Sequence, residues 1–302
     1  MEGLCIVYLM SGSRFFINRY EELGWKYEKV TPRRALRLNS MNIRESIDLV
    51  GRLQSLRIEL IKIPFLENGF WVRKSRFSLG AITEYLSGLF SIQEAASQIP
   101  VTLFEELRNK TVLDACAAPG GKTVQLADLM CNTGAVTALD VTIRRLAALS
   151  NQLERCRVEN TVVYDLDARR ISTIGKKFDR ILLDVPCSGN FVASEDWFKM
   201  RTFEDVKRNA MLQREILSEA VEVLERDGEI VYSTCSLEPE ENELNIDWAI
   251  SNLDVDVVEI DCYGQKGLTN VFGERLNDSI EKCRRIWPGL TQGFFVAKLI
   301  RE

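Results

Sequence analysis

The sequence predicts an α/β protein in which a doubly wound, mostly parallel sheet follows a small α+β unit. From about residue 103, short apolar runs alternate with longer amphipathic segments, the pattern of a parallel sheet covered by helices on both faces. A glycine-rich turn joins the first of these runs to a helix, as in folds that bind ligands at the carboxyl ends of their strands. We therefore divide the chain into units at 1–102 and 103–302.

The first unit is expected to hold one helix followed by a β-α-β-β pattern. Residues 14–30 carry aromatic and leucine side chains at helical spacing, which predicts an amphipathic helix. Short apolar runs then predict strands around a helix near 43–54. The predicted strands cover 36–39, 56–60 and 70–72.

The second unit is expected to supply the main sheet. A helix is predicted from Lys122 to Met130, directly after the glycine-rich turn, and a long amphipathic helix at 205–225. The predicted strands of this unit are 112–115, 135–139, 161–164, 181–184, 230–232, 255–260 and 293–299. In such a sheet, residues just past the carboxyl ends of the parallel strands line the ligand crevice.

The composition excludes several kinds of chemistry. The 302 residues include no histidine, which removes Ser-His and Cys-His catalysis and histidine metal sites. No two of the eight cysteines are spaced C-x-x-C, so no metal site is predicted, and scattered cysteines favour a reducing, cytoplasmic setting. No membrane segment is predicted either, because 4–10 is apolar but short; we interpret 1–13 as an N-terminal extension. A monomer is favoured.

The charge is distributed unevenly. The chain carries −5 overall, but residues 1–110 hold 16 Lys and Arg against 12 Asp and Glu. The excess lies in 31–37 and 71–76, where basic residues stand beside prolines and aromatics. Such segments are able to follow a phosphate backbone, and they are equally consistent with an ordinary solvated face.

The glycine-rich turn predicts a cofactor site. The run from Val112 to Thr123 reads strand, tight turn, helix, and its small residues let a ligand approach the backbone closely. Asp140, about twenty residues past Gly120, is placed to bond ribose hydroxyls, and Asp167 follows the third strand, where it is placed to accept from an adenine amino group. For each acid alone, an N-cap or surface role is the alternative.

A P-loop ATPase is a competing interpretation of the same turn. Gly121-Lys122-Thr123 resembles the end of a Walker A loop, and 181–184 resembles a Walker B strand. Against it, the Walker pattern needs glycine where this chain has Cys116, and Pro119 removes an amide from the phosphate cradle. A nucleoside cofactor without a triphosphate fits better.

Two cysteines each follow an apolar run that is predicted to be a buried parallel strand. Cys187 stands three residues after Asp184, at the end of one strand, and Cys235 ends the run Tyr232-Ser233-Thr234-Cys235. Thiols at this edge, with a carboxylate beside one of them, predict covalent chemistry on an electrophilic carbon. Packing as small apolar side chains is the alternative.

These segments resemble the Sun-type (Nol/Nop/Sun) RNA 5-methylcytosine methyltransferases. The resemblance is carried by C-A-A-P-G-G-K from Cys116, D-V-P-C-S-G from Asp184 and S-T-C-S from Ser233. Further similar segments are 37–41, 90–97 and 140–146, the last of which points to Arg145. The resemblance covers roughly 14–300, and in size the chain is most similar to compact archaeal members that act on tRNA.

The resemblance implies a Rossmann-like methyltransferase fold that uses S-adenosyl-L-methionine, with a seven-stranded sheet whose last strand is antiparallel. It also implies that the α+β unit binds RNA. The predicted cofactor site comprises Cys116, Ala117, Ala118, Pro119, Gly120, Gly121, Lys122, Asp140, Arg145, Asp167 and Asp184.

The resemblance also assigns catalytic roles. Carbon 5 of cytosine is a poor nucleophile, and adding a thiolate to carbon 6 activates it. By resemblance Cys235 is that thiolate and Cys187 assists release of the product. Asp184 is expected to hold the ring at nitrogen 3, and Lys122 to lower a thiol pKa.

One segment departs from the family pattern. After Gly189 many relatives continue with glycine and basic residues, whereas 190–197 here reads N-F-V-A-S-E-D-W. Because carbon 5 lies within the stack of a duplex, the target cytosine is expected to be flipped or single-stranded. Phe191 and Trp197 are candidates to stack on bases, with core packing as the alternative.

Three other functions remain open. An rRNA target is the nearest rival to tRNA, because nothing in these motifs identifies the RNA. DNA cytosine methylation needs only Cys187 as nucleophile and leaves Cys235 idle. A non-catalytic RNA-binding protein is the third.

Overall fold

The computed structural model describes residues 11–43, 48–194 and 196–301. The interpretation of the N-terminus as an extension falls mainly on residues 1–10, which lie outside this range. Within the described ranges, no helix has both the length and the apolar character that crossing a bilayer requires.

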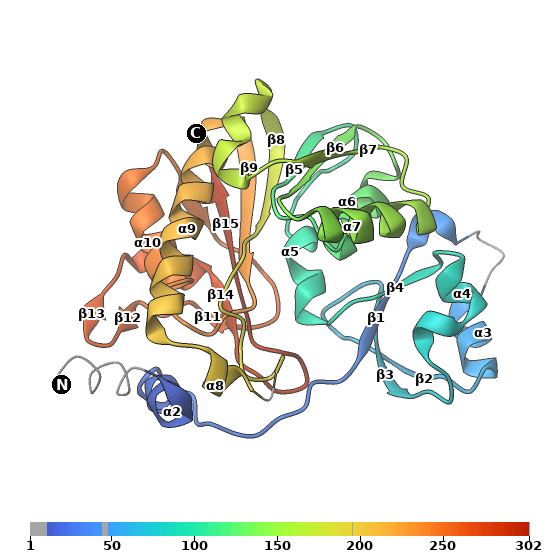
Figure 1. The fold of residues 1–302 in the computed structure, drawn as a ribbon, viewed down its shortest axis with the longest axis horizontal. Coiled ribbons are helices and arrows are strands. Elements are labelled where there is room, and N and C mark those ends of the chain that lie inside the picture. Colours follow the sequence, from blue (N-terminus) through green and yellow to red (C-terminus); the bar gives the residue numbers. More distant parts are fainter. Residues whose placement is uncertain (1–10, 44–47, 195, 302) are drawn as a thin grey trace.

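A large sheet forms the centre of the molecule, and its order is β11-β14-β15-β9-β8-β5-β6-β7 (Figure 1). Strands β5 to β9 pair in parallel, and β15 is antiparallel to β9. The strands are β5 (Thr111–Asp114), β6 (Ala135–Asp140), β7 (Thr161–Asp165), β8 (Phe178–Asp184), β9 (Leu224–Thr234), β10 (Asp256–Val258), β11 (Gln265–Lys266), β14 (Arg284–Ile286) and β15 (Phe294–Ile300).

The predicted Rossmann-like α/β fold is therefore confirmed, including its antiparallel last strand. The sheet has nine strands where seven were expected. The two additional strands, β11 and β14, are antiparallel and extend the edge beside β15, whose other end pairs with β10. They are too short to give a periodic signal in the sequence. Beyond them β12 (Asn270–Val271) and β13 (Glu274–Arg275) form a separate hairpin.

Alternation along the central strands gives the sheet two buried faces. In β8, Ile181 and Leu183 face one core and Leu182 faces the other. One face is covered by α5 (Ile99–Thr102), α6 (Gly121–Met130) and α7 (Ile143–Arg155), and the other by η4 (Ala168–Ile174), α9 (Phe203–Glu222) and α10 (Glu243–Asn252). Burial on both faces explains why these strands read as continuous apolar runs.

The smaller sheet lies beside the large one and has the order β2-β3-β1-β4, with antiparallel neighbours (Figure 1). The predicted β-α-β-β order is confirmed by β1 (Ala35–Leu38), α3 (Leu49–Ser55), β2 (Glu59–Lys62) and β3 (Gly69–Lys74). Strand β4 (Phe90–Ile92) was not predicted, because three residues are too few for a periodic pattern. Short helical turns complete this unit: η1 (Ser40–Asn42), η2 (Leu79–Ala81), α4 (Thr83–Leu86) and η3 (Ala96–Gln98).

A buried ion pair joins the smaller sheet to the large one. Arg37 of β1 donates to Asp128 of α6 at 3.0 Å and to Gln93 at 3.0 Å. Arg37 is therefore withdrawn from solvent, which corrects the interpretation that it contacts phosphates but leaves the rest of 31–37 untested. Arg33, Arg34 and the basic residues of 71–76 remain exposed.

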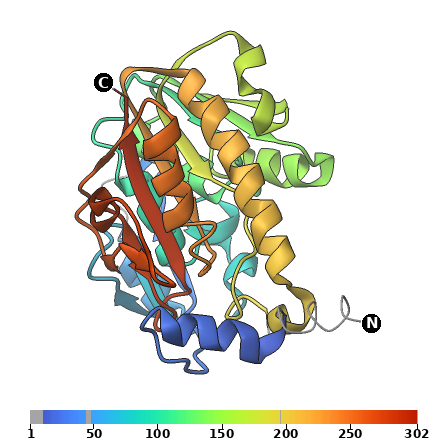
Figure 2. The same ribbon diagram turned by 90° about the vertical axis from the view of Figure 1, so that its left-hand side faces the viewer.

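Helix α2 (Gly12–Glu22) is shorter than the helix predicted at 14–30. The chain leaves it at Gly24, whose φ of +90° does not continue a helix. Its buried Phe16 and Tyr20 pack with Phe191 and Trp197, beside α8 (Trp197–Met200), so α2 lies against the large sheet's unit (Figures 1 and 2). The predicted boundary at residue 102 had placed this helix with the smaller sheet.

Candidate active site

The two candidate catalytic thiols meet above the carboxyl ends of β8 and β9. Cys187 follows β8 by three residues and Cys235 follows β9 directly. Their sulfur atoms lie 3.2 Å apart, and both side chains are partly exposed. The predicted meeting of the two thiols at the carboxyl edge of the sheet agrees with the structure, in which β8 and β9 are parallel neighbours.

The two thiols differ in acidity. The hydrogen bond between them raises the pKa of Cys187 well above the usual thiol value, and burial raises it further. The same hydrogen bond lowers the pKa of Cys235. This is the arrangement in which Cys187 donates its proton and Cys235 carries the thiolate. By contrast, burial raises the pKa of Cys116, Cys262 and Cys283.

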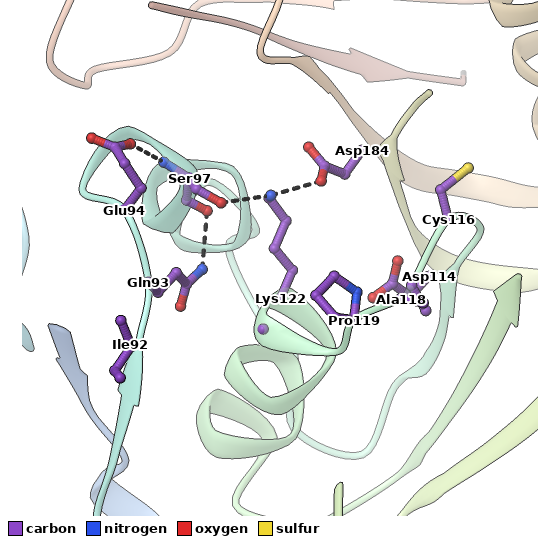
Figure 3. A pocket seen from close by; sticks show the side chains of 12 residues that line it. Ile92, Gln93, Glu94, Ser97, Asp114, Cys116, Ala118, Pro119, Lys122 and Asp184 are labelled. Carbon is purple, nitrogen blue, oxygen red and sulfur yellow. Dashed lines mark hydrogen bonds and ion pairs between the residues drawn. The ribbon is translucent and has the colours of Figure 1, made fainter. Parts of the chain in front are cut away.

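Lys122 and Asp184 form an ion pair next to the thiols. Lys122, in the first turn of α6, donates to Asp184 Oδ2 at 2.7 Å and to Ser97 Oγ at 2.8 Å (Figure 3). The other carboxylate oxygen of Asp184 accepts from Ser233 at 2.9 Å. The side chain of Lys122, which had suggested a P-loop, therefore forms an ion pair with a carboxylate of the protein. The predicted effect of Lys122 on thiol acidity is secondary to that of Cys187.

A cavity of about 220 Å³ opens beside this ion pair (Figure 3). Its wall includes most of the glycine-rich turn, together with Lys122, Asp184 and the segment before η3. The lining residues are Ile92, Gln93, Glu94, Ser97, Asp114, Cys116, Ala117, Ala118, Pro119, Gly121, Lys122 and Asp184.

Asp114, the last residue of β5, is the least satisfied polar group of this wall. Its Oδ2 accepts from Thr123 at 2.8 Å, but its Oδ1 is buried and has no hydrogen-bond partner. Burial raises the pKa of this carboxyl to about 7. A buried carboxylate oxygen that lacks a donor favours a cationic ligand in the cavity.

A second cavity, of about 170 Å³, shares Cys116 with the first. Asp140 and Asp167 lie on its wall with Arg145, among apolar side chains of the opposite helix. The lining residues are Ala115, Cys116, Asp140, Val141, Arg145, Leu166, Asp167, Ala168, Arg169, Pro186, Leu212 and Ile216. An apolar slot that presents a buried carboxylate suits a nucleoside.

The predicted acids of this second cavity have protein partners. Asp140 is buried and pairs with Arg145 at 3.3 Å, and Arg145 also reaches the carbonyl oxygen of Ala118 at 2.5 Å. Asp167 accepts from the backbone N–H of Arg169 at 2.9 Å, as the N-cap of η4, and pairs with the Arg169 side chain at 2.7 Å. For Asp167 the N-cap role considered in the sequence is therefore present, and its carboxylate also faces the cavity.

The glycine-rich turn requires glycine at position 120 because of its backbone conformation and its close approach to a neighbouring side chain. Gly120 has a φ of +104°, and a Cβ there would lie 2.9 Å from the side chain of Leu149. Its N–H donates to Ala117 at 2.8 Å, which closes the turn before α6. The turn therefore depends on a left-handed residue without a side chain.

The aromatic candidates for base stacking are buried. Phe191 and Trp197 belong to the aromatic cluster around α2, and Trp197 Nε1 donates to the carbonyl oxygen of Ser188 at 2.7 Å. Of the two interpretations of these side chains, packing is the one that their burial supports.

Four polar residues of the site were missed by sequence reasoning. Ser97 and Ser233 stand inside segments that carry the family resemblance, which was the available signal. Asp114 reads as an ordinary strand-end acid. Glu241 belongs to an acidic run, 238–243, that is typical of an exposed helix start, and nothing in its spacing shows that it is buried.

The residues present fit S-adenosylmethionine. The two cavities adjoin each other. The cavity at Asp140 has the size of a nucleoside, and the cavity at Asp114 and Asp184 is polar. The orphaned oxygen of Asp114 suits a ligand that carries positive charge.

Comparisons with known proteins agree with this geometry. The family model described as 16S rRNA methyltransferase RsmB/F matches residues 101–300. Among curated proteins, a 28S rRNA (cytosine-C(5))-methyltransferase of Mus musculus is 36% identical over 273 residues, 87% of this chain and 34% of that protein. Ribosomal RNA small subunit methyltransferase F of Aeromonas salmonicida is 36% identical over 283 residues, 88% of this chain and 57% of that protein. The chain thus spans between about a third and somewhat over half of the length of these relatives.

A solved structure is similar along the whole chain. It is the crystal structure of a methyltransferase homologue from Pyrococcus horikoshii, which matches with a TM-score of 0.84 and 36% identity. The match covers 100% of this chain and 95% of that one.

Proposed function

We propose that this chain, which belongs to the RsmB/F methyltransferase family, transfers a methyl group from S-adenosylmethionine to carbon 5 of cytosine in RNA. The observation that carries the proposal is the thiol pair, in which the sulfur atoms of Cys187 and Cys235 lie 3.2 Å apart, just past the strand end at Asp184, which lines the first cavity. A methyltransferase acting on a more nucleophilic atom has no need of a thiolate there.

The cofactor would be held by the two cavities. Asp140 is placed for the ribose hydroxyls, and Asp114 for positive charge on the amino acid part. When bound, S-adenosylmethionine supplies an electrophilic methyl group on a sulfonium. The turn 116–121 brings backbone close to the ligand because Gly120 permits it.

Cys235 is the proposed nucleophile. Its Sγ adds to carbon 6 of the cytosine, which raises electron density at carbon 5. The hydrogen bond from Cys187 favours the thiolate form of Cys235 before the RNA arrives. In the free protein, this hydrogen bond makes Cys235 rather than Cys187 the nucleophile.

Asp184 and Lys122 are proposed to control charge on the base. The Asp184 carboxyl, once it has taken a proton from the Lys122 ammonium that donates to it at 2.7 Å, would pass that proton to nitrogen 3, where electron density gathers when carbon 6 is attacked. Lys122 and Ser233 fix both of its oxygens and so orient it. After methylation, Cys187 Sγ, having released its own proton to solvent, would accept the carbon 5 proton. The electron pair of that carbon–hydrogen bond re-forms the double bond between carbons 5 and 6, Cys235 leaves carbon 6 as a thiolate, and the proton on nitrogen 3 returns to Asp184.

The RNA is proposed to be ribosomal. The named relatives at 36% identity are rRNA methyltransferases, whereas the sequence-based preference was tRNA. The exposed basic residues of the smaller unit, among them Arg33, Arg34 and Arg73, are suited to phosphate contacts. The tRNA substrate expected from the sequence stays an untested alternative to rRNA, and the cytoplasmic location stays a prediction.

The test is methyl transfer from labelled S-adenosylmethionine to purified rRNA and, separately, to tRNA. We expect label in cytosine of rRNA, with a loss on the order of a thousandfold or more for Cys235→Ala. Cys187→Ala is expected to accumulate a covalent protein–RNA complex. Label only in tRNA would keep the chemistry and overturn the substrate. Unchanged transfer by Cys235→Ala would overturn the mechanism, and no transfer to either RNA by a protein that binds the cofactor would overturn the proposed function.

A further inference from the structure

One buried carboxylate lies beneath both cysteines. Glu241 is fully buried in the segment between β9 and α10. Its carboxylate accepts from the backbone N–H of Ser188 at 3.0 Å and from Ser236 Oγ at 3.1 Å. Ser188 is the residue after Cys187, and Ser236 is the residue after Cys235. The two loops that carry the thiols are thus anchored on the same side chain.

Other contacts hold the same two loops together. Gln213 of α9 donates from one amide nitrogen to Glu241 and to the carbonyl oxygen of Pro186, both at 2.8 Å. The hydroxyl oxygens of Ser188 and Ser236 lie 3.0 Å apart. Glu241 therefore has a donor from each thiol loop and one from the helix behind them.

We infer that Glu241 is a positioning residue that holds the Cys187 and Cys235 loops together and so sets the distance between the two sulfur atoms. Among the described residues, Glu241 makes no hydrogen bond to either sulfur and does not line the two cavities described above, so it acts through the loops. This inference rests on the proposed function, in which the acidity of Cys235 matters because its thiolate attacks the base.

The energetics support this role. A carboxylate without exposure is costly to bury unless its hydrogen bonds are complete. Glu241 meets this condition only when both thiol loops are in place, since it loses a donor whenever either loop moves away. Its negative charge opposes a nearby thiolate, so its charge does not explain the lowered pKa of Cys235. The lowered pKa of Cys235 is explained instead by the loop geometry that Glu241 enforces.

A matched control lies three residues earlier in the same segment. Glu238 is as buried as Glu241, and burial raises the pKa of each of the two carboxyls to about 7. Its partners are Tyr20 at 2.7 Å and Arg19 at 3.1 Å, both on α2. Glu238→Gln therefore removes the same buried charge without loosening either thiol loop.

The test is the pH dependence of Cys235 alkylation by iodoacetamide, followed by mass spectrometry of the Cys235 peptide in the full-length protein. We expect Glu241→Gln to raise the apparent pKa of Cys235 by about one unit, a roughly tenfold loss of thiolate near neutral pH. Glu238→Gln is expected to leave that pKa unchanged. In a Cys187→Ala background, Glu241→Gln is expected to add no further shift, because the hydrogen bond that it supports is already absent.

Two outcomes overturn the inference: a folded Glu241→Gln variant with an unchanged Cys235 pKa, or an equal shift in Glu238→Gln. If Glu241→Gln fails to fold by circular dichroism, Ser236→Ala removes a single hydrogen bond of the carboxylate and is expected to shift the pKa in the same direction by less; no shift would then overturn the inference. Alkylation needs no RNA, so failure of methyl transfer by the wild type would refute the proposed function and leave the role of Glu241 decided by the thiol data.

Discussion

The two thiols at the centre of the site are the same residue type at equivalent strand ends, yet they have different acidities. What separates them is the hydrogen bond that they share, which lowers the pKa of Cys235 and raises the pKa of Cys187. Sequence spacing predicted that both would reach the same edge of the sheet. It did not reveal that the two thiols would differ in acidity, because the loops that carry them are held by Glu241, through the backbone N–H of Ser188 and the hydroxyl of Ser236, and no local pattern records these contacts.

The acidity of Asp114 leads to a prediction about cofactor binding. Burial raises its pKa to about 7, and a cationic ligand beside the orphaned oxygen favours the ionised form. Below that pKa the carboxyl is neutral in the free protein, so binding must first release a proton. The affinity for S-adenosylmethionine is therefore expected to fall as the pH drops from 7.5 to 5.5, by up to about tenfold per unit below the pKa.

Calorimetric titration across that pH range checks this prediction. Asp114→Asn is expected to bind more weakly at pH 7.5 and to lose most of the pH dependence. A wild-type affinity that does not change with pH, or the same slope in the variant, would contradict the role of Asp114.

Among the structural elements, the turn before α6 depends most on a single residue. Gly120 combines a left-handed φ of +104° with a close approach to Leu149. Gly120→Ala is expected to cost about 1–2 kcal/mol for the backbone and a further ~1–3 kcal/mol for overpacking. Cofactor affinity is expected to fall as well, since the turn lines the first cavity between Ala117 and Lys122.

Gly175→Ala is the matched control for denaturant unfolding. Gly175 has a φ of +66°, but no atom lies within 4 Å of a Cβ placed there. We expect it to show the backbone cost alone and an unchanged cofactor affinity. Equal losses of stability in the two variants would refute the packing argument at Gly120.

Elements with a strong periodic pattern were predicted well, and short ones were not. Helix α9 matches the prediction at 205–225 closely, because its apolar face is regular and Thr202 and Asp205 form a capping box at its start. Strand β4 and the edge strands β11 and β14 are two or three residues long, and tertiary pairing rather than propensity defines them. Helix α2 ends early because Gly24 adopts a positive φ, which the aromatic spacing of 14–30 did not reveal.

For the whole molecule, the junction between the two sheets rests on a buried charge pair. Arg37 and Asp128 are both almost fully buried and lie 3.0 Å apart. Arg37→Ala leaves the Asp128 carboxylate without its cation, and we expect a loss on the order of 3–5 kcal/mol in the free energy of unfolding. Because α6 also carries Lys122, cofactor affinity is expected to fall with it.

Urea unfolding of Arg37→Ala beside Arg73→Ala checks this expectation. Arg73 pairs with Glu59 at 3.9 Å with both side chains largely exposed, so its loss is expected to cost less than about 1 kcal/mol. Similar small losses in both variants would show that the junction does not depend on the Arg37 ion pair.

The mostly parallel sheet, its antiparallel last strand and the edge at which the motif residues gather were predictable, because alternating strands and helices leave few topologies. The arrangement of the chain around that sheet was not. No pattern in the sequence indicates that α2 packs against the unit of the large sheet. There the Tyr20 hydroxyl donates to the carboxylate of Glu238, which lies 218 positions later in the chain. Nor does the sequence show that Arg37 turns inward, since a buried arginine and an exposed one read alike in a basic segment.

The most direct test of the central claim identifies the cysteine that bonds to the base. RNA transcribed with 5-fluorocytidine holds a carbon 5 substituent that cannot leave as a proton, so the adduct persists after methyl transfer. We would incubate it with the wild-type protein and S-adenosylmethionine, digest both polymers and sequence the linked peptide by mass spectrometry. We expect a nucleotide bonded to the sulfur of Cys235, in an adduct that forms only when the cofactor is present. A nucleotide on Cys187, or no adduct from a preparation that methylates ordinary RNA, would contradict it.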